Sequence, residues 1–225
     1  MGIYVIMIVF FLISFLVGQQ LRSKFAKYSR VSLAKGLSGK EVAELMLSNN
    51  GITDVRVISV EGQLTDHYNP TDKTVNLSPD VYNGRSVAAA AVAAHECGHA
   101  IQHAKSYAFL QMRSSLVPVV SIASRYVQWV LLAGVILLQT FPAILLIGVV
   151  MLALTTLFSF ITLPVEFDAS RRALAWLNST GLTYGESADN ARDALKWAAL
   201  TYVVAALGSL ATLLYYLGFL NGNDD

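Results

Sequence analysis

His95, Glu96 and His99 have the residue types and the spacing of a group that binds a metal ion and uses it to activate water. Residues four apart on a helix lie one above the other, so His95 and His99 can both offer a ring nitrogen to one ion. Glu96 is one step round the same helix and can accept a proton from a water on that ion. The expected ion is a single Zn²⁺, and the expected chemistry is hydrolysis of a peptide bond.

A catalytic zinc site has three protein ligands and one position open to water, so a third ligand must come from elsewhere. The candidates are Glu166, Asp168 and His103. His103 lies on the same helix face, but it is about 6 Å further along the axis than His99. Glu166 directly follows a long uncharged stretch, where a carboxylate is costly without a purpose. We therefore expect Glu166 as the third ligand, with Asp168 and His103 as supporting groups or alternative ligands.

Three long stretches carry no Asp, Glu, Lys or Arg, as is typical of membrane-spanning segments: residues 1–21, 126–165 and 197–222. A straight helix over the middle stretch would be about 60 Å long, whereas the hydrocarbon core of a bilayer is about 30 Å thick. This stretch should therefore hold two spans. The turn between them is expected at residues 139–142, because proline is disfavoured inside a helix but accepted in its first turn.

Four spans divide the chain into segments that lie on opposite sides of the cell membrane. The expected order is a transmembrane helix over 1–20, a soluble domain over 21–115 with the HExxH helix over about 86–106, transmembrane helices over 116–140 and 141–164, a segment over 165–196 that carries the third zinc ligand, a transmembrane helix over 197–220, and a tail over 221–225. All 16 Lys and Arg residues lie between Arg22 and Lys196. By the positive-inside rule, the charged segments are cytoplasmic and both termini lie outside. The chemistry agrees, because His95 and Glu166 can share an ion only if an even number of spans separates them.

Composition narrows the classes of partner. The net charge of +1 gives no reason to expect a nucleic acid, and the single cysteine excludes an intrachain disulfide. The expected partners are the lipid bilayer and a protein or peptide substrate that is membrane-proximal or unfolded.

The soluble part is expected to be a small α+β domain. Ser38 and Glu41 have the spacing of a capping box, which predicts a helix from Ser38 to Ser48. Residues 55–60 and 74–77 are typical of short strands, and Ser86 should cap an Ala-rich helix that contains the HExxH sequence. The predicted fold class is a mainly α membrane protein, with four transmembrane helices and a zincin-like α+β cytoplasmic domain that carries the HExxH helix.

The chain resembles the bacterial YugP-like neutral zinc metallopeptidases over nearly its whole length, most clearly in residues 66–70, 93–102 and 163–170. The resemblance implies a membrane zinc peptidase, and it leaves the substrate open. More distantly, the chain resembles the HtpX heat-shock proteases and the CAAX prenyl proteases, in which a later glutamate ligand belongs to an ExxxD pattern. Glu166 matches that glutamate, but Ser170 stands where the aspartate is expected. Asp168 points to another side of a helix, so the group that orients His95 stays open.

Several further residues are secondary candidates. His67 or Tyr68 could donate a hydrogen bond to the oxyanion that forms on an attacked carbonyl, although His67 could equally be a turn histidine beside Asp66. Cys97 stands at a variable position of the motif, where packing is the expected role. Thr74–Leu77 could be an edge strand that pairs with an extended substrate, or a strand of a structural hairpin.

The function expected first is that of a membrane-bound zinc metalloendopeptidase with its site near the cytoplasmic membrane surface. One alternative is an intramembrane site-2-type protease with HExxH in a spanning helix, which the charge of Arg85 shortly before His95 disfavours. Another is a non-enzymatic membrane scaffold stabilised by zinc, which should have four protein ligands. Glu166 could then be an ordinary interfacial carboxylate that faces Arg171 or Arg172.

Overall fold

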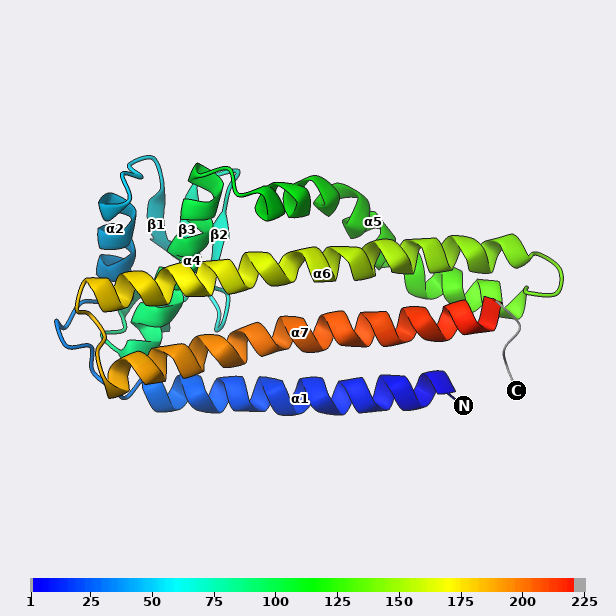
Figure 1. Ribbon diagram of the computed structural model, residues 1–225, viewed down its shortest axis with the longest axis horizontal. Helices are drawn as coiled ribbons and strands as arrows, with labels where there is room; N and C mark the ends of the chain where they lie inside the picture. Colours follow the sequence, from blue (N-terminus) through cyan, green and yellow to red (C-terminus); the bar gives the residue numbers. More distant parts are fainter. Residues whose placement is uncertain (1, 221–225) are drawn as a thin grey trace. The chain divides into compact units, whose positions relative to one another are not determined.

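The computed structural model describes residues 2–220, so the tail expected over 221–225 lies outside the described residues. It is mainly helical and contains one three-stranded sheet (Figure 1). The elements are α1 (Gly2–Tyr28), α2 (Gly39–Asn49), β1 (Arg56–Ser59), β2 (His67–Asn69), β3 (Thr74–Leu77), α3 (Pro79–Asn83), α4 (Val87–Ala104), α5 (Ala108–Ile136), α6 (Pro142–Ser179) and α7 (Glu186–Leu220). They form two compact units: a helical unit, with described residues 2–16, 111–163 and 201–220, and a mixed unit of residues 17–110 and 164–200.

The sheet of the mixed unit has the strand order β1-β3-β2. β1 runs parallel to β3, whereas β2 runs antiparallel to it. All four residues of β3 are buried, so the suggestion that Thr74–Leu77 is an edge strand is wrong. An extended pattern predicts a strand, but whether the strand has one neighbour or two depends on which segments return to it. Here the chain crosses over to place β1 on one side, and β2, which the pattern did not reveal, occupies the other.

The N-terminus of α2 is held by the predicted capping box. The Ser38 hydroxyl accepts a hydrogen bond from the Glu41 backbone N–H, and the Glu41 carboxylate accepts one from the Ser38 N–H at 2.7 Å. Both bonds satisfy donors that a helix terminus would otherwise leave without partners. The buried face of α2 then packs against α4.

α4, the HExxH helix, is a core helix of the mixed unit. It begins after Ser86, whose side chain accepts from the backbone N–H of Ala89, as expected of an N-cap. Fourteen of its 18 residues are buried, and many of these are alanines that let neighbouring backbones approach closely. The core around α4 combines apolar side chains from α2, β3, α6 and α7: Val42, Met46, Val75, Leu77, Ala173, Leu177, Ala191 and Leu195.

Four helices are long and apolar enough to cross a membrane, namely α1, α5, α6 and α7, and α4 is not among them. The predicted break in the middle stretch is present, because α5 ends at Ile136 and α6 begins at Pro142. α6 then continues without interruption to Ser179. Glu166 therefore lies on the continuation of a candidate spanning helix.

The helical unit shows the close contacts typical of helices packed in lipid. A Cβ atom on Gly134 of α5 would lie 2.5 Å from the Cα of Leu145 on α6, so only glycine allows this approach. Between α6 and α7, the hydroxyls of Thr156 and Ser209 are 2.6 Å apart. Such contacts hold helices together where burial of apolar surface cannot, because lipid is itself apolar.

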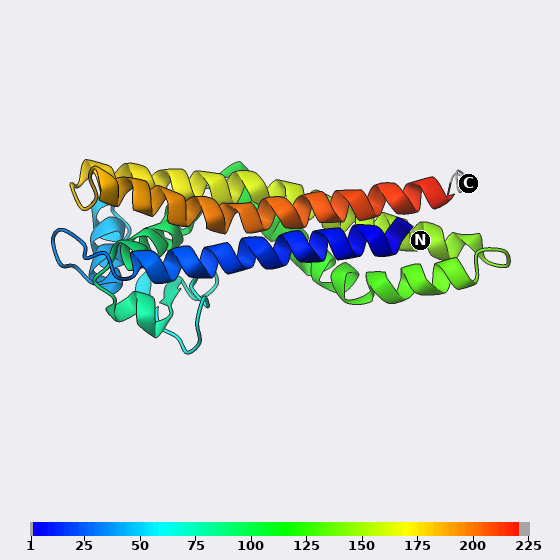
Figure 2. The same cartoon turned by 90° about the horizontal axis from the view of Figure 1, so that it is seen from below.

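α1 and α7 lie side by side in both Figure 1 and Figure 2. In the mixed unit, the Tyr28 hydroxyl donates to the Asp193 carboxylate at 2.5 Å, and the Lys24 ammonium lies 2.7 Å from the same carboxylate. These contacts join the two helices at the end where both become charged.

Candidate metal centre

Two helices of the mixed unit carry the candidate ligands. His95 and His99 project from consecutive turns of α4, and Glu166 projects from α6. The helices meet at Gly98, where a Cβ atom would lie only 2.7 Å from the backbone oxygen of Ala169. A side chain at this variable position of the motif would separate the helices, and with them the ligands that each one carries.

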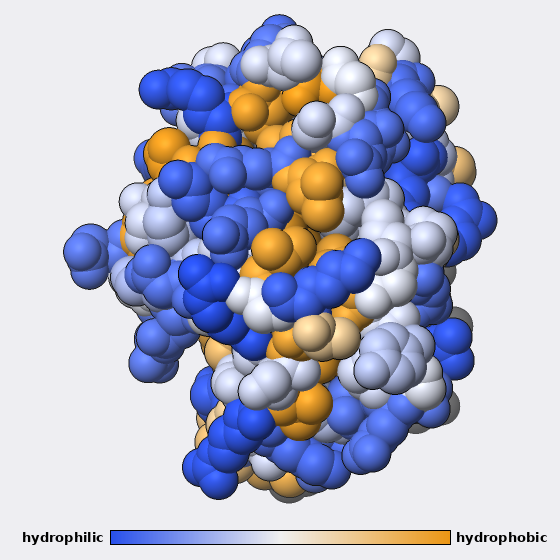
Figure 3. Space-filling model, turned by 90° about the vertical axis from the view of Figure 1, so that its left-hand side faces the viewer, coloured by the Kyte–Doolittle hydropathy of each residue, from blue (hydrophilic) through white to orange (hydrophobic). Residues whose placement is uncertain are grey.

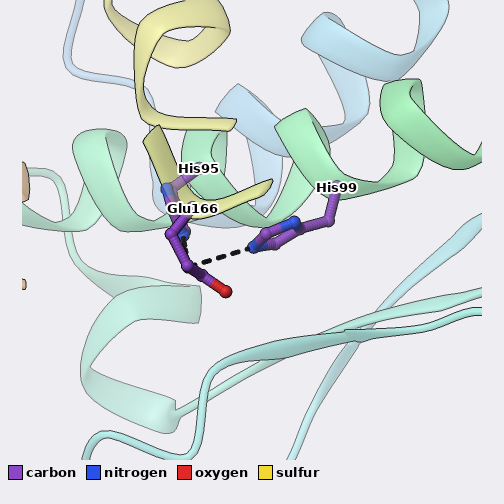
Figure 4. Close-up of side chains that lie close together, drawn as sticks. All are labelled: His95, His99 and Glu166. Atoms are coloured by element: carbon purple, nitrogen blue, oxygen red, sulfur yellow. Dashed lines mark ion pairs between the residues drawn. The ribbon is translucent and has the colours of Figure 1, made fainter. Parts of the chain in front are cut away.

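The three side chains point toward one another (Figure 4). The Glu166 Oε2 atom lies 3.3 Å from the His95 Nε2 atom and 3.6 Å from the His99 Nε2 atom. One ligand atom from each residue falls within 4.8 Å of the others. Ligands on a tetrahedral zinc with bonds of about 2.0–2.1 Å stand about 3.3 Å apart, so the spacing suits such an ion.

Glu166 itself indicates that a cation belongs here. The residue is only 2% exposed, and its Oε2 atom has no hydrogen-bond partner among the described residues. A buried carboxylate oxygen without a partner is costly unless a positive charge compensates it. Two imidazoles and one carboxylate are also a donor set of catalytic zinc sites, so these residues fit a zinc ion.

The surroundings of the site favour positive charge. Burial alone would lower the pKa of His99, but the Glu166 carboxylate, 3.6 Å from its Nε2 atom, and the negative charge of Glu96 together raise it above its ordinary value. Glu96 is itself buried, at 7% exposure, next to His95 in sequence. The carboxylates of Glu96 and Glu166 thus both place negative charge near the site, which would stabilise a bound cation.

His99 is oriented by a buried chain of hydrogen bonds. Its Nδ1 atom lies 3.0 Å from the Oε1 atom of Gln102, a fully buried side chain. The Gln102 amide nitrogen donates to the Val165 carbonyl at 2.8 Å and to the Asp168 carboxylate at 2.9 Å. Since both amide hydrogens are used, Gln102 Oε1 must accept, which places the proton of His99 on Nδ1. The lone pair of Nε2 is then free to bind a metal.

Asp168, considered above as an alternative ligand, is instead the charged acceptor at the end of this series of hydrogen bonds. Its carboxylate accepts from Arg172 at 2.5 Å and also from Arg171, in addition to Gln102. Among residues 2–220, the metal-binding atoms that lie close together belong to His95, His99 and Glu166, and Asp168 is not one of this group. The Asp168 carboxylate therefore supports His99 indirectly, through Gln102.

His95 is oriented by Ser170. The Ser170 hydroxyl lies 3.1 Å from the His95 Nδ1 atom, and the Nε2 atom faces Glu166. Ser170 thus occupies the position where the distant relatives would have an aspartate, and it contacts the histidine that such an aspartate would be expected to orient. A hydroxyl can accept the Nδ1–H bond, but it lacks the negative charge of a carboxylate.

The other residues singled out from the sequence lie outside the group of three. His103 has its Nδ1 atom 2.8 Å from the Tyr68 hydroxyl, and His67 has its Nδ1 atom 2.8 Å from the Thr65 carbonyl oxygen. Cys97 is buried against the Ala43 carbonyl, and burial raises the pKa of its thiol, as expected of a packing residue.

Comparison with known proteins shows the family of the chain. A family model described as "Putative neutral zinc metallopeptidase" matches residues 3–221 of the chain. The chain belongs to this family. It is also 42% identical over 214 residues to a protein of Bacillus subtilis (strain 168) named "Putative membrane protease YugP", a match that covers 95% of this chain and 94% of that protein. No solved structure gives a significant match. The family and the four apolar helices together describe a membrane-associated zinc metallopeptidase.

Sequence reasoning missed Gln102 and undervalued Ser170. Both were within reach of helix periodicity, because Gln102 is three residues after His99 and Ser170 is four residues after Glu166. The missing information was which way α4 and α6 face each other. Only their packing shows that Gln102 reaches Asp168 and that Ser170 reaches His95.

Proposed function

We propose that this membrane protein is a zinc metalloendopeptidase in which His95, His99 and Glu166 bind one zinc ion and Glu96 is the general base. The observation that carries the proposal is the convergence of three metal-binding donors from α4 and α6 around a buried carboxylate oxygen without a hydrogen-bond partner. The HExxH spacing then places Glu96 beside the first ligand.

The chain's own residues account for the proton transfers. When bound, zinc lowers the pKa of a water molecule and polarises the carbonyl group of the scissile bond. Glu96 accepts a proton from the attacking water, for which its buried position beside His95 is suited. The same carboxylate passes that proton to the amide nitrogen as the peptide bond breaks.

The number of ligands favours catalysis over a structural role. Structural zinc sites usually have four protein ligands, whereas catalytic sites have three and leave one position for water. Among residues 2–220, three donors form the group. This supports an enzyme rather than a zinc-stabilised scaffold. The interior position of α4 likewise supports a site outside the spanning helices, rather than a site-2-type arrangement.

We further propose that the site faces the cytoplasm. His95 and Glu166 contact each other, and two candidate spans, α5 and α6, begin between them in the chain. The positive charges lie in the same segments as the site. The end of the mixed unit that carries α2 presents mostly hydrophilic side chains (Figure 3), as suits a surface in water. Because Glu166 directly follows an uncharged stretch, the expected substrates are membrane-proximal or unfolded protein segments.

The decisive test of catalysis is Glu96→Gln in the purified full-length protein. We expect cleavage of denatured casein to fall by about 10²–10⁴-fold, with zinc content unchanged, because the general base is lost but no ligand is. Glu61→Gln, an exposed carboxylate on a loop, is the matched control and should cleave like the wild type. A Glu96→Gln protein that cleaves at the wild-type rate would rule out the proposed mechanism.

The orientation can be tested with Ser48→Cys on α2. Ser48 is exposed, whereas the native Cys97 is buried, so a maleimide that cannot cross membranes should report on the new cysteine alone. In intact cells we expect no labelling, and after permeabilisation full labelling. Labelling in intact cells would place the mixed unit outside.

A further inference from the structure

A second site is present in the mixed unit, and none of its lining residues belongs to the metal centre. It is a cavity of about 650 Å³. One wall is a single face at the end of α1, formed by Arg22, Phe25 and Ala26 and extended by Ser29 just after the helix, with the i, i+3, i+4, i+7 spacing of one helix face. The segment that leads from β3 into α4 supplies Ser78, Asp80, Arg85 and Ser86, and Ser32 and Gln63 complete the polar lining.

The cavity is basic. Arg22 and Arg85 line it against one carboxylate, that of Asp80. Arg22 has no ion pair among the described residues, and its side chain is exposed. Arg85 donates through Nη1 to Gly36 and Glu41, but a guanidinium has five N–H donors, so others are left for a ligand. Two arginines suit a phosphate group, which can accept several N–H bonds at once.

The chain around Arg22 adds to this charge. Five basic residues and no acidic residue occur from position 22 to position 37: Arg22, Lys24, Lys27, Arg30 and Lys35. Basic clusters directly after a spanning helix are typical of contacts with anionic lipid headgroups, each charge contributing about 1 kcal/mol. The charge and the cavity therefore point to the same kind of ligand.

The position of the cavity along α1 indicates that a phosphate group bound there would come from a lipid. Arg22 is the first charged residue after an uncharged run that begins at the N-terminus, and α1 is continuous through both. The Arg22 side chain extends back along the helix, with its Nη2 atom 3.9 Å from where a Cβ atom of Gly18 would lie. This is the direction of a side chain that reaches for the membrane interface. An arginine in this position is expected at the depth of lipid headgroups.

We infer that this cavity binds the phosphoglycerol headgroup of an anionic phospholipid, phosphatidylglycerol. Arg22 and Arg85 hold the phosphate, and the Asp80 carboxylate accepts hydrogen bonds from the glycerol hydroxyls. Phe25 and the half-exposed Leu64 form the apolar part of the wall, against which the first acyl carbons pack. The site is independent of the proposed peptidase activity, because it shares no residue with the metal centre.

The test uses delipidated full-length protein in a neutral detergent, with dilauroyl-phosphatidylglycerol as the probe and native mass spectrometry as the readout. We expect Arg22→Gln to weaken binding roughly fivefold and the double variant with Arg85→Gln roughly 25-fold. Arg56→Gln, an exposed arginine on β1 away from the cavity, is the matched control and should bind like the wild type. Equal binding by the wild type and the double variant would overturn the inference.

Two further probes decide the chemistry of the ligand. Dilauroyl-phosphatidylethanolamine has the phosphate and the acyl chains without net negative charge, and equal binding of this lipid would refute an anionic headgroup site. Glycerol phosphate has the headgroup without acyl chains, and equally tight binding of it would refute a lipid as the source. The inference requires both to bind at least about tenfold more weakly than phosphatidylglycerol, which is about 1.4 kcal/mol.

Discussion

His95 and His99 lie one turn apart on α4 and face the same carboxylate, but they are supported differently. His99 rests on Gln102, which is fully buried and joined to Asp168 and to a backbone carbonyl. His95 rests on the hydroxyl of Ser170. One histidine is thus fixed by a satisfied network with a charged anchor, and the other by one neutral contact. The carboxylate that the distant relatives would place beside His95 has a counterpart here, but it acts on His99 through an amide.

Because of this difference, substituting the residue that supports His99 should lower zinc affinity more than substituting the residue that supports His95. Groups that orient metal-binding histidines typically contribute 10–100-fold in metal affinity. The contribution of the buried network to zinc affinity should be near the upper end of this range, because removing Gln102 leaves polar groups unpaired in the interior. The Ser170 contact should lie at or below the lower end.

Removing the ligand that both histidines face should have the largest effect. We expect Glu166→Gln to lower zinc affinity by more than about 100-fold, because a charged ligand is replaced by a neutral one. Zinc content after dialysis against a graded series of chelator concentrations measures this. Glu186→Gln, an exposed residue at the start of α7, is the control. Full zinc content in Glu166→Gln would show that the third ligand lies elsewhere.

Cutting the network beneath His99 should have the next largest effect. In Gln102→Ala, we expect zinc affinity to fall by roughly 10–100-fold and the thermal midpoint of the zinc-free protein to fall as well. The second change follows because Asp168 and the Val165 carbonyl lose their shared donor. Gln111→Ala, at an exposed position of α5, is the control. Wild-type affinity in Gln102→Ala would mean that His99 needs no support.

The smallest effect is expected at Ser170. We expect Ser170→Ala to lower zinc affinity by less than about tenfold, because a neutral contact is lost. We expect Ser170→Asp to raise it above that of the wild type, since a carboxylate accepts a stronger bond from the Nδ1–H of His95. Ser179→Ala, at the last residue of α6, is the control, because the Ser179 hydroxyl donates to the Trp176 carbonyl of the same helix. If Ser170→Ala and Gln102→Ala lowered zinc affinity equally, the two histidines would be supported equally, contrary to this comparison.

The sequence predicted those parts of the molecule that depend on neighbours along the chain. The HExxH helix with its Ser86 cap, the capping box at Ser38 and the break before Pro142 all arise from residues within a few positions of one another. The uncharged stretches likewise predicted the four apolar helices, because charge is costly anywhere in a bilayer.

The unpredicted parts depend on how distant segments face each other. Thr74–Leu77 has the pattern of a strand, but its place at the centre of the sheet is set by a parallel crossover to β1. The partners of His95 and His99 are set by the packing of α4 on α6. Local periodicity does not determine either arrangement, because the same hydrophobic pattern is compatible with several strand neighbours and several helix packings.

The contact of Gly98 with Ala169 favours a small ion in the site. It brings the backbones of α4 and α6 close together, so the histidines and Glu166 stand near one another. Zinc bonds to nitrogen and oxygen are about 2.0–2.2 Å long, whereas calcium requires about 2.3–2.6 Å and more ligands. The close approach of α4 and α6 therefore suits the short bonds and few ligands of zinc, and it depends on a glycine at a position that the motif leaves unspecified.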